Sequence, residues 1–245
     1  MRKLKKYKPT PFMAADSVYD ESAANYAVAF IEALSHTKGR WAGKPFTLID
    51  WQEQIIRDVF GILKPNGYRQ FNTAYIEIPK KQGKSELAAA VALLLTCGDG
   101  EERAEVYGCA ADRGQATIVF DVAADMVRMC PALSRRVKIL ASTKRIIYLP
   151  TNSFYQVLSS DVKSKSGLNP SCVILDEIWT YPNPDLAKML TTGSGDARKQ
   201  PLFLYLTTAG NQLSGYGWEM HCRAKDILTG KRVDSTFLPI IYGLD

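Results

Sequence analysis

Residues 75–85 are Tyr-Ile-Glu-Ile-Pro-Lys-Lys-Gln-Gly-Lys-Ser, and this stretch decides the fold class. The run 73–78 predicts a buried strand. Residues 85–96 predict a helix with one apolar face formed by Leu87, Val91, Leu94 and Leu95. A strand, a tight turn and a helix therefore follow one another in the order that a phosphate-binding loop requires.

The turn itself contains the residue types that phosphate chemistry needs. Gly83 lets the backbone approach phosphates, Lys84 neutralises their charge, and the Ser85 hydroxyl stands at a helix start, where it can hold Mg²⁺. A usual phosphate loop has a glycine five residues before Gly83, whereas Ile78 stands there in this chain. Taken alone, the pattern also fits a surface turn before an amphipathic helix.

Two acids follow a second apolar run, Cys-Val-Ile-Leu-Asp-Glu at residues 172–177. A central parallel strand has this composition, and its carboxyl end faces the ligand crevice of an α/β sheet. Asp176 is then placed to bind Mg²⁺, directly or through water, and Glu177 to orient or deprotonate an attacking water. The alternative is a purely structural segment, a core strand followed by an acidic turn, but the upstream loop favours the catalytic interpretation.

Residues 202–209, Leu-Phe-Leu-Tyr-Leu-Thr-Thr-Ala, predict another buried strand, and Gly210 follows it. Thr207 and Thr208 at its end are expected to sense a γ-phosphate from the neighbouring strand tip. Earlier in the chain, Gln52 has an amide that can recognise an adenine edge. Gln52 also opens a helix whose predicted buried face is ordinary packing, formed by Ile55, Ile56, Val59 and Phe60.

Together these elements resemble the ATPase domain of the large terminase subunit of tailed bacteriophages. The resemblance covers roughly residues 40–245 and rests on Trp51-Gln52, the loop 79–85 without its first glycine, and the stretches 110–116, 167–177 and 206–210. It implies an α/β fold of the P-loop NTPase class, ASCE type, with a mostly parallel central sheet flanked by helices. Residues 1–70 are expected to form an N-terminal helical lid, and residues 71–245 the ATPase core.

The resemblance also implies residue roles. The expected ATP-binding set is Gln52, Pro79, Lys80, Lys81, Gln82, Gly83, Lys84, Ser85 and Glu86. Lys80 or Lys81 would assist the γ-phosphate, and Glu177 with Lys84 would complete the catalytic set. Ser85 and Asp176 would hold Mg²⁺, and Thr207, Thr208 and Gly210 would couple hydrolysis to movement. An arginine finger for a neighbouring subunit would come from Arg103, Arg113, Arg128, Arg135, Arg136 or Arg145.

As a function, the resemblance implies a motor that hydrolyses ATP with Mg²⁺ and drives double-stranded viral DNA into a procapsid. Its expected partners are duplex DNA, the small terminase subunit, the portal and further copies of itself in a ring. Its expected location is the cytoplasm of the infected bacterial host. A ribonuclease-H-like nuclease follows the ATPase in this family, and because this chain stops about where that domain begins, no nuclease activity is expected from it.

Composition agrees with one globular, non-membrane domain. The chain has 245 residues, of which 46% are hydrophobic and 23% charged, and it contains no run long enough for a transmembrane helix and no signal peptide. Five cysteines without a CxxC pair indicate reduced thiols, and the presence of only two histidines argues against a histidine-based site. The net charge of +6 suits a phosphate-rich partner. The candidate backbone contacts are Arg2, Lys3, Lys5, Lys6, Lys8, Lys163 and Lys165.

The remaining segments predict strands separated by helices, which favours a doubly wound sheet. The predicted elements are a helix at 16–35 with Tyr26, Ala29, Phe30 and Ala33 inward, a helix after Asp50, a strand at 105–110, a helix at 113–129 and a hairpin joining 145–149 to 154–158. Two other functions stay open from sequence. One is a helicase-like nucleic-acid ATPase, which would need further motifs, and the other is a nucleotide-gated assembly protein without turnover.

Overall fold

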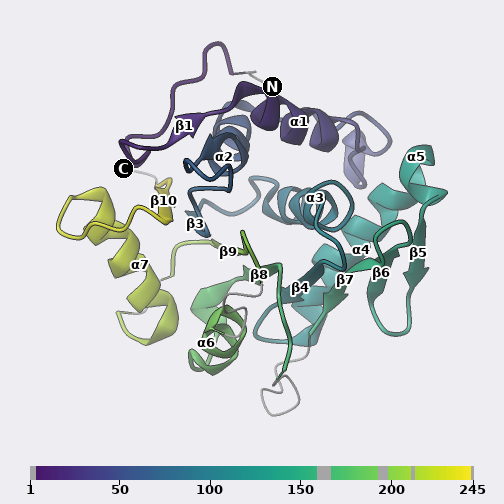
Figure 1. Cartoon of the computed structure of the whole chain (residues 1–245). Coiled ribbons are helices and arrows are strands. Elements are labelled where there is room, and N and C mark those ends of the chain that lie inside the picture. The colour runs from purple at the N-terminus through teal and green to yellow at the C-terminus, as the bar shows by residue number, and fades with distance from the viewer. Residues whose placement is uncertain (1–3, 159–166, 193–197, 211–212, 244–245) are drawn as a thin grey trace.

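Within the described residues, a sheet of eight strands lies at the centre of the protein (Figure 1). The computed structural model describes residues 4–158, 167–192, 198–210 and 213–243. In spatial order the strands are β10 (Phe237–Ile241), β3 (Thr73–Glu77), β9 (Leu202–Thr207), β8 (Cys172–Asp176), β4 (Glu105–Cys109), β7 (Ser153–Val157), β6 (Arg145–Tyr148) and β5 (Val137–Leu140). Neighbours from β10 to β7 are parallel, and β6 and β5 continue antiparallel. The predicted mostly parallel α/β sheet is confirmed.

Helices cover both faces of the sheet (Figure 1). One face packs against α1 (Glu21–Glu32), α2 (Asp50–Gly61), α3 (Lys84–Cys97) and α4 (Arg113–Met129), and the other against α6 (Asp185–Thr192) and α7 (Gly215–Leu228). Side chains of β3 alternate between the two cores, since Ala74 and Ile76 face the first and Tyr75 the second. Shorter elements are β1 (Val18–Tyr19), β2 (Ile62–Leu63), η1 (Gly39–Trp41), α5 (Pro131–Ser134) and η2 (Ile178–Thr180).

Helix α3 lies between the sheet and the helices outside it. The prediction gave this helix one apolar face, but every residue from Leu87 to Thr96 is buried. Four alanines among them let the sheet, α1 and α4 all approach closely. The helix that begins directly after the turn at 79–83 is therefore held on every side, and its first residues are fixed relative to the sheet.

The predicted inward face of α1 is wrong. Its buried residues are Ala24, Ala27, Val28 and Ile31, whereas Tyr26 is 54% exposed. Small residues face inward because α1 packs closely on α2: a Cβ added at Gly61, the last residue of α2, would lie 2.7 Å from the Ala24 Cβ. Helices α1 and α2 share one hydrophobic core with α3 and β3.

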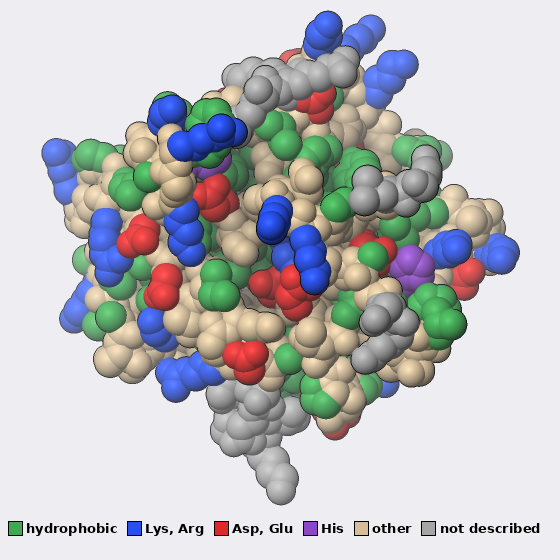
Figure 2. Space-filling view, turned by 180° about the vertical axis from the view of Figure 1, so that it is seen from behind, with side chains coloured by type: hydrophobic (Ala, Val, Ile, Leu, Met, Phe, Trp, Pro, Cys, Tyr) green, Lys and Arg blue, Asp and Glu red, His purple; other side chains and the backbone are tan. Residues whose placement is uncertain are grey.

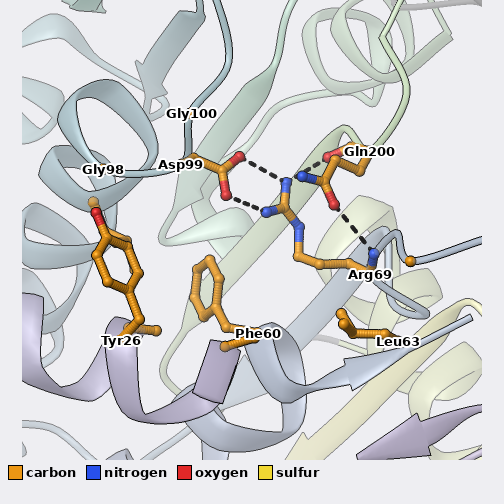
Figure 3. A pocket seen from close by; sticks show the side chains of 12 residues that line it. Tyr26, Phe60, Leu63, Arg69, Gly98, Asp99, Gly100 and Gln200 are labelled. Carbon is orange, nitrogen blue, oxygen red and sulfur yellow. Dashed lines mark hydrogen bonds and ion pairs between the residues drawn. The ribbon is translucent and has the colours of Figure 1, made fainter. Parts of the chain in front are cut away.

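A buried arginine joins three distant segments at the edge of the sheet where β3 and β9 begin. Arg69, only 5% exposed, donates to both carboxylate oxygens of Asp99 and to the Gln200 carbonyl, while its backbone N–H donates to the Gln200 side chain (Figure 3). Burial raises the pKa of the Asp99 carboxyl, and the Arg69 charge opposes that rise. Beside this group lies a cavity of about 290 Å³ that Tyr26 and Phe60 also line.

We predict that Arg69→Met lowers the free energy of unfolding by about 3–5 kcal/mol, because it leaves the Asp99 charge buried and unpaired. Urea unfolding measures the loss. The matched control is Arg128→Met, which removes an exposed pair with Asp125 and should cost about 0–1 kcal/mol. Adding Asp99→Leu to Arg69→Met should restore most of the stability. A loss from Arg69→Met no larger than that of the control would contradict this role.

Candidate functional site

The ends of three central strands bring the predicted site together. In the parallel register Glu77 of β3 lies opposite Thr207 of β9, and Leu206 of β9 lies opposite Asp176 of β8. The residues that follow these strands therefore leave the sheet at one edge. Strand β9 separates β3, the strand before the loop, from β8, the strand that ends in the acids.

The turn at 79–83 has a backbone shape that leads directly into α3. Lys81 and Gly83 have φ angles of 66° and 77°, in the left-handed region, and α3 begins at Lys84. A Cβ on Gly83 would lie 3.5 Å from the Gln52 Nε2, so Gln52 packs against the turn. The Gln52 Oε1 accepts a hydrogen bond from the Ile49 N–H at 3.2 Å. The Gln52 side chain thus lies beside the turn, and its carbonyl oxygen is hydrogen-bonded to Ile49, the residue before α2.

Lys84 contacts both predicted acids. Its Nζ lies 3.1 Å from the Asp176 Oδ1 and forms a shorter ion pair with the Glu177 Oε1. Burial raises the pKa of the Asp176 carboxyl; the Lys84 charge opposes that rise, and the Glu177 charge adds to it. The Asp176 Oδ1 is buried, and its contact with Lys84 lacks the geometry of a hydrogen bond. The loop lysine and the two acids predicted from separate motifs thus form one cluster.

Glu177 is held in an unusual backbone conformation. Its φ is 52°, a left-handed value that costs a non-glycine residue about 1–2 kcal/mol. The Glu177 N–H donates to the Leu206 carbonyl at 2.8 Å. Its Oε2 accepts hydrogen bonds from both the N–H and the hydroxyl of Thr208, each at 3.2 Å. The side chain is therefore fixed from β9 on one side and by Lys84 on the other.

A cavity of about 420 Å³ lies at this edge. Its lining residues are Lys38, Pro79, Lys80, Lys81, Gly83, Lys84, Ser85, Glu86, Ile118, Val122, Glu177 and Thr208. Most of the predicted site residues are among them. Gln82, Gln52, Asp176, Thr207 and Gly210 lie outside this lining, and Thr207 is fully buried, with its hydroxyl bonded to the Thr208 carbonyl.

Three lining residues were missed by the sequence analysis. Ile118 and Val122 are four residues apart on one side of α4, a spacing that also fits ordinary core packing. Lys38 comes from the segment between α1 and α2, where no motif marks it. Its position follows only from tertiary contacts.

Gly210, predicted as a coupling residue, packs against Trp179. A Cβ on Gly210 would lie 2.2 Å from the Trp179 ring, and one on Gly217 of α7 would lie 2.7 Å from the Trp179 backbone. Trp179 comes two residues after Glu177 and lies about 6 Å, ring to ring, from Trp218 and His221. These two glycines therefore form a slot that fixes the chain just after Glu177.

The predicted DNA-contacting residues are only partly described. Lys5, Lys6 and Lys8 are exposed near the amino terminus, whereas Arg2, Lys3, Lys163 and Lys165 lie outside the described residues. Figure 2 shows one face of the molecule, on which basic and acidic side chains are interspersed. No arginine is among the described residues that line the cavity, so none of the six candidate fingers faces it from its own chain. None of the described helices has the length and apolar character needed to cross a membrane.

Comparison with known proteins assigns this chain to a family. The sequence model described as "Terminase large subunit, ATPase domain" matches residues 50–225. The chain belongs to that family. The large terminase subunit of Enterobacteria phage HK97 is 34% identical over 185 residues, which is 74% of this chain and 36% of the relative. Protein YmfN of Escherichia coli strain K12 is 32% identical over 79 residues, 32% of this chain and 17% of that protein.

Solved terminase structures agree with the fold. The crystal structure of the HK97 large terminase matches with a TM-score of 0.76 and 28% identity, over 91% of this chain and 44% of that one. The large terminase of a thermophilic bacteriophage, solved in complex with ADP, matches with a TM-score of 0.55 and 11% identity, over 70% and 40% of the two chains, and supports the fold alone. This terminase ATPase chain thus spans less than half the length of these relatives.

We predict that Gly210→Ala displaces Trp179, because the added methyl group has no room beside the ring. The expected result is a changed tryptophan emission spectrum and a loss of about 1–3 kcal/mol in the free energy of unfolding. Gly243→Ala is the matched control, since a Cβ there meets nothing within 4 Å. If both variants kept the parent spectrum and unfolding midpoint, the glycine slot would not constrain Trp179.

Proposed function

We propose that this chain is an ATPase that hydrolyses ATP at the cavity between the turn at 79–83 and the ends of β8 and β9. The observation that supports it most is the meeting of Lys84 with Asp176 and Glu177 beside a cavity large enough for a nucleotide's phosphates. Phosphoryl transfer needs these parts: a phosphate-binding backbone turn, a cation and a water-orienting acid. The match of residues 50–225 to the terminase ATPase-domain model supports a nucleotide as the ligand.

The proposed ATP contacts are Gln52 together with the consecutive residues Pro79, Lys80, Lys81, Gln82, Gly83, Lys84, Ser85 and Glu86. The left-handed Gly83 presents backbone N–H groups to the phosphates, and the N-terminal end of α3 favours their negative charge. Lys80 or Lys81 would stabilise charge on the γ-phosphate. Gln52, packed on Gly83, would contact the base.

Mg²⁺ fits the proposed site. Among the described residues the buried Asp176 Oδ1 accepts no hydrogen bond and has only its ion pair with Lys84, and Ser85 lines the cavity at the first turn of α3. Both are oxygen ligands of the kind that Mg²⁺ prefers, with phosphates and water completing its coordination. Bound there, Mg²⁺ would neutralise developing charge on the phosphates.

In the proposed mechanism Glu177 orients water, or accepts its proton, for attack on the γ-phosphate, while Lys84 stabilises negative charge. Thr208 directly follows β9 and donates two hydrogen bonds to Glu177, so a movement of that carboxylate would be transmitted directly to β9. Thr207, Thr208 and Gly210 would therefore transmit hydrolysis to the rest of the domain. The N-terminal region 1–70 would respond as a lid against the core 71–245.

In the assembled motor we propose that copies of this chain form a ring around double-stranded DNA and translocate it into a procapsid. The small terminase subunit and the portal would be its partners, and the host cytoplasm its location. DNA would be held by basic contacts to its backbone, because packaging must proceed through any sequence. We expect no nuclease activity from these 245 residues.

The test is Mg²⁺-dependent ATP hydrolysis by this chain and by Glu177→Ala, at several protein concentrations, with and without duplex DNA. We expect Glu177→Ala to bind ATP and to lose turnover by about 100-fold or more. Turnover per chain that rises with concentration would indicate a site completed by a neighbour. Lys84→Ala should weaken ATP binding by about 10- to 100-fold and also reduce turnover.

Normal turnover by Glu177→Ala would contradict the proposed role of Glu177 in hydrolysis. Unchanged ATP affinity in Lys84→Ala would contradict the proposal that the loop 79–85 binds phosphates. ATP binding without turnover under every condition would favour the nucleotide-gated assembly protein. Strand displacement by the chain would favour a helicase-like motor.

A second prediction concerns the hydroxyl of Thr208. Thr208→Val keeps the backbone N–H bond to Glu177 and removes the hydroxyl bond, so we expect kcat to fall about 10-fold, with ATP affinity changed by less than about 2-fold. Steady-state kinetics together with ATP titration separates the two effects. Thr192→Val is the control, because among the described residues that hydroxyl donates only to the Lys188 carbonyl within α6. An unchanged kcat in Thr208→Val would remove the hydroxyl from the mechanism.

A further inference from the structure

Residues 36–44, between α1 and α2, form a closed loop of defined shape. The His36 N–H donates to the Lys44 carbonyl at 2.9 Å, and the Gly43 N–H donates to the His36 carbonyl at 2.8 Å. Gly39 and Gly43 have φ angles of 62° and 77°, which permit the tight return of the chain. The His36 ring packs on Phe46 at 4.7 Å. The loop is therefore built to hold one conformation.

This loop is fastened to the start of α3 through Glu86. The Glu86 Oε2 lies 2.6 Å from the His36 Nδ1, and its Oε1 accepts hydrogen bonds from the Thr37 N–H at 3.1 Å and the Thr37 hydroxyl at 3.5 Å. His36 is 7% exposed, so this junction is largely protected from water. Because Glu86 directly follows Ser85, the junction fixes the loop to the same helical turn that borders the cavity.

The loop contains three cations, and only one of them faces the cavity. Arg40 and Lys44 lie over the Trp41 ring, at 5.2 Å and 4.9 Å from its centre. Lys38, next to the junction, lines the cavity with Lys80, Lys81 and Lys84. Arg40 and Lys44 are thus engaged by the Trp41 ring, and Lys38 is the cation of this loop that is available to a ligand in the cavity.

The charges at the cavity favour a polyanion. Lys84 is paired with Asp176 and Glu177. Within the described part of the chain no ion pair uses Lys38, Lys80 or Lys81. Three lysines without acidic partners around one cavity raise the local concentration of negatively charged ligands.

We propose that Lys38 binds the phosphates of the nucleotide and that Glu86 is a positioning residue, which holds the loop 36–44 where Lys38 reaches them. This inference rests on the proposed function and adds a phosphate contact from outside the 79–85 motif. Of the proposed ATP contacts, Glu86 then contacts the nucleotide only through its backbone, because its carboxylate is bonded to His36 and Thr37. The N-terminal region thereby contributes charge to the nucleotide site itself.

The first test is titration of each variant with the non-hydrolysable analogue AMP-PNP and Mg²⁺. We expect Lys38→Ala to weaken binding about 10-fold, the loss of one charge-assisted hydrogen bond. Lys38→Arg should retain affinity to within about 3-fold, because it keeps the charge. Lys44→Ala is the matched control in the same loop and should leave affinity unchanged, since Lys44 lies over Trp41.

The second test distinguishes a positioning role for Glu86 from that of a bystander acid at the cavity. A bystander acid repels phosphates, so Glu86→Ala would tighten binding. If Glu86 positions the loop, Glu86→Ala weakens binding about 3- to 10-fold, and adding Lys38→Ala costs less than it does in the parent chain, because the two residues act as a unit. Equal or tighter binding by Glu86→Ala overturns the positioning role.

Lys84→Ala separates this inference from the proposed function. If Lys84→Ala weakens AMP-PNP binding and Lys38→Ala does not, the inference fails while the proposed site stands. If neither variant changes binding, the nucleotide site itself is wrong. Lys38 is exposed, so its variants should keep the parent urea midpoint, and affinities are compared only among variants that do.

Discussion

The register of β3, β9 and β8 is the constraint on which the site depends. Each strand has side chains in two cores, so a slip by one residue would move every apolar side chain to the wrong face. Both cores therefore fix which residues stand at the strand ends. Since the three strands are parallel, Lys84, Asp176, Glu177 and Thr208 come within hydrogen-bonding or ion-pairing distance at one edge.

At that edge of the sheet, charged side chains and a strained backbone at Glu177 lie where a site for phosphate chemistry would need them. Glu177 has a left-handed backbone. Its carboxylate accepts hydrogen bonds from the N–H and the hydroxyl of Thr208 and forms an ion pair with Lys84. The Trp179 slot fixes the residues that follow. A side chain restrained on several sides loses little further freedom when a ligand binds, and this is what preorganised catalysis requires.

Sequence patterns predicted most of the sheet and the centre of the site, because each of these features is local. The loop 79–85 and the acids after β8 have short signatures, and strong apolar runs mark their strands. Strand β10 was missed because Pro239 interrupts its pattern. The inward face of α1 was wrong because large aromatic residues suggested burial where alanines pack. Lys38 was missed because it is placed by the contacts of its neighbours His36 and Thr37 with Glu86, which is distant in sequence.

The position of β9 also determines the order in which the protein can assemble. This strand is synthesised after both of its neighbours, β3 and β8, yet it lies between them in the sheet. Those neighbours cannot adopt their final spacing until residues 202–207 have left the ribosome, and strand pairings this distant in sequence are slow to form. A nascent chain that has reached Glu177 therefore contains Lys84 and both acids of the cluster, but not the strand that aligns them.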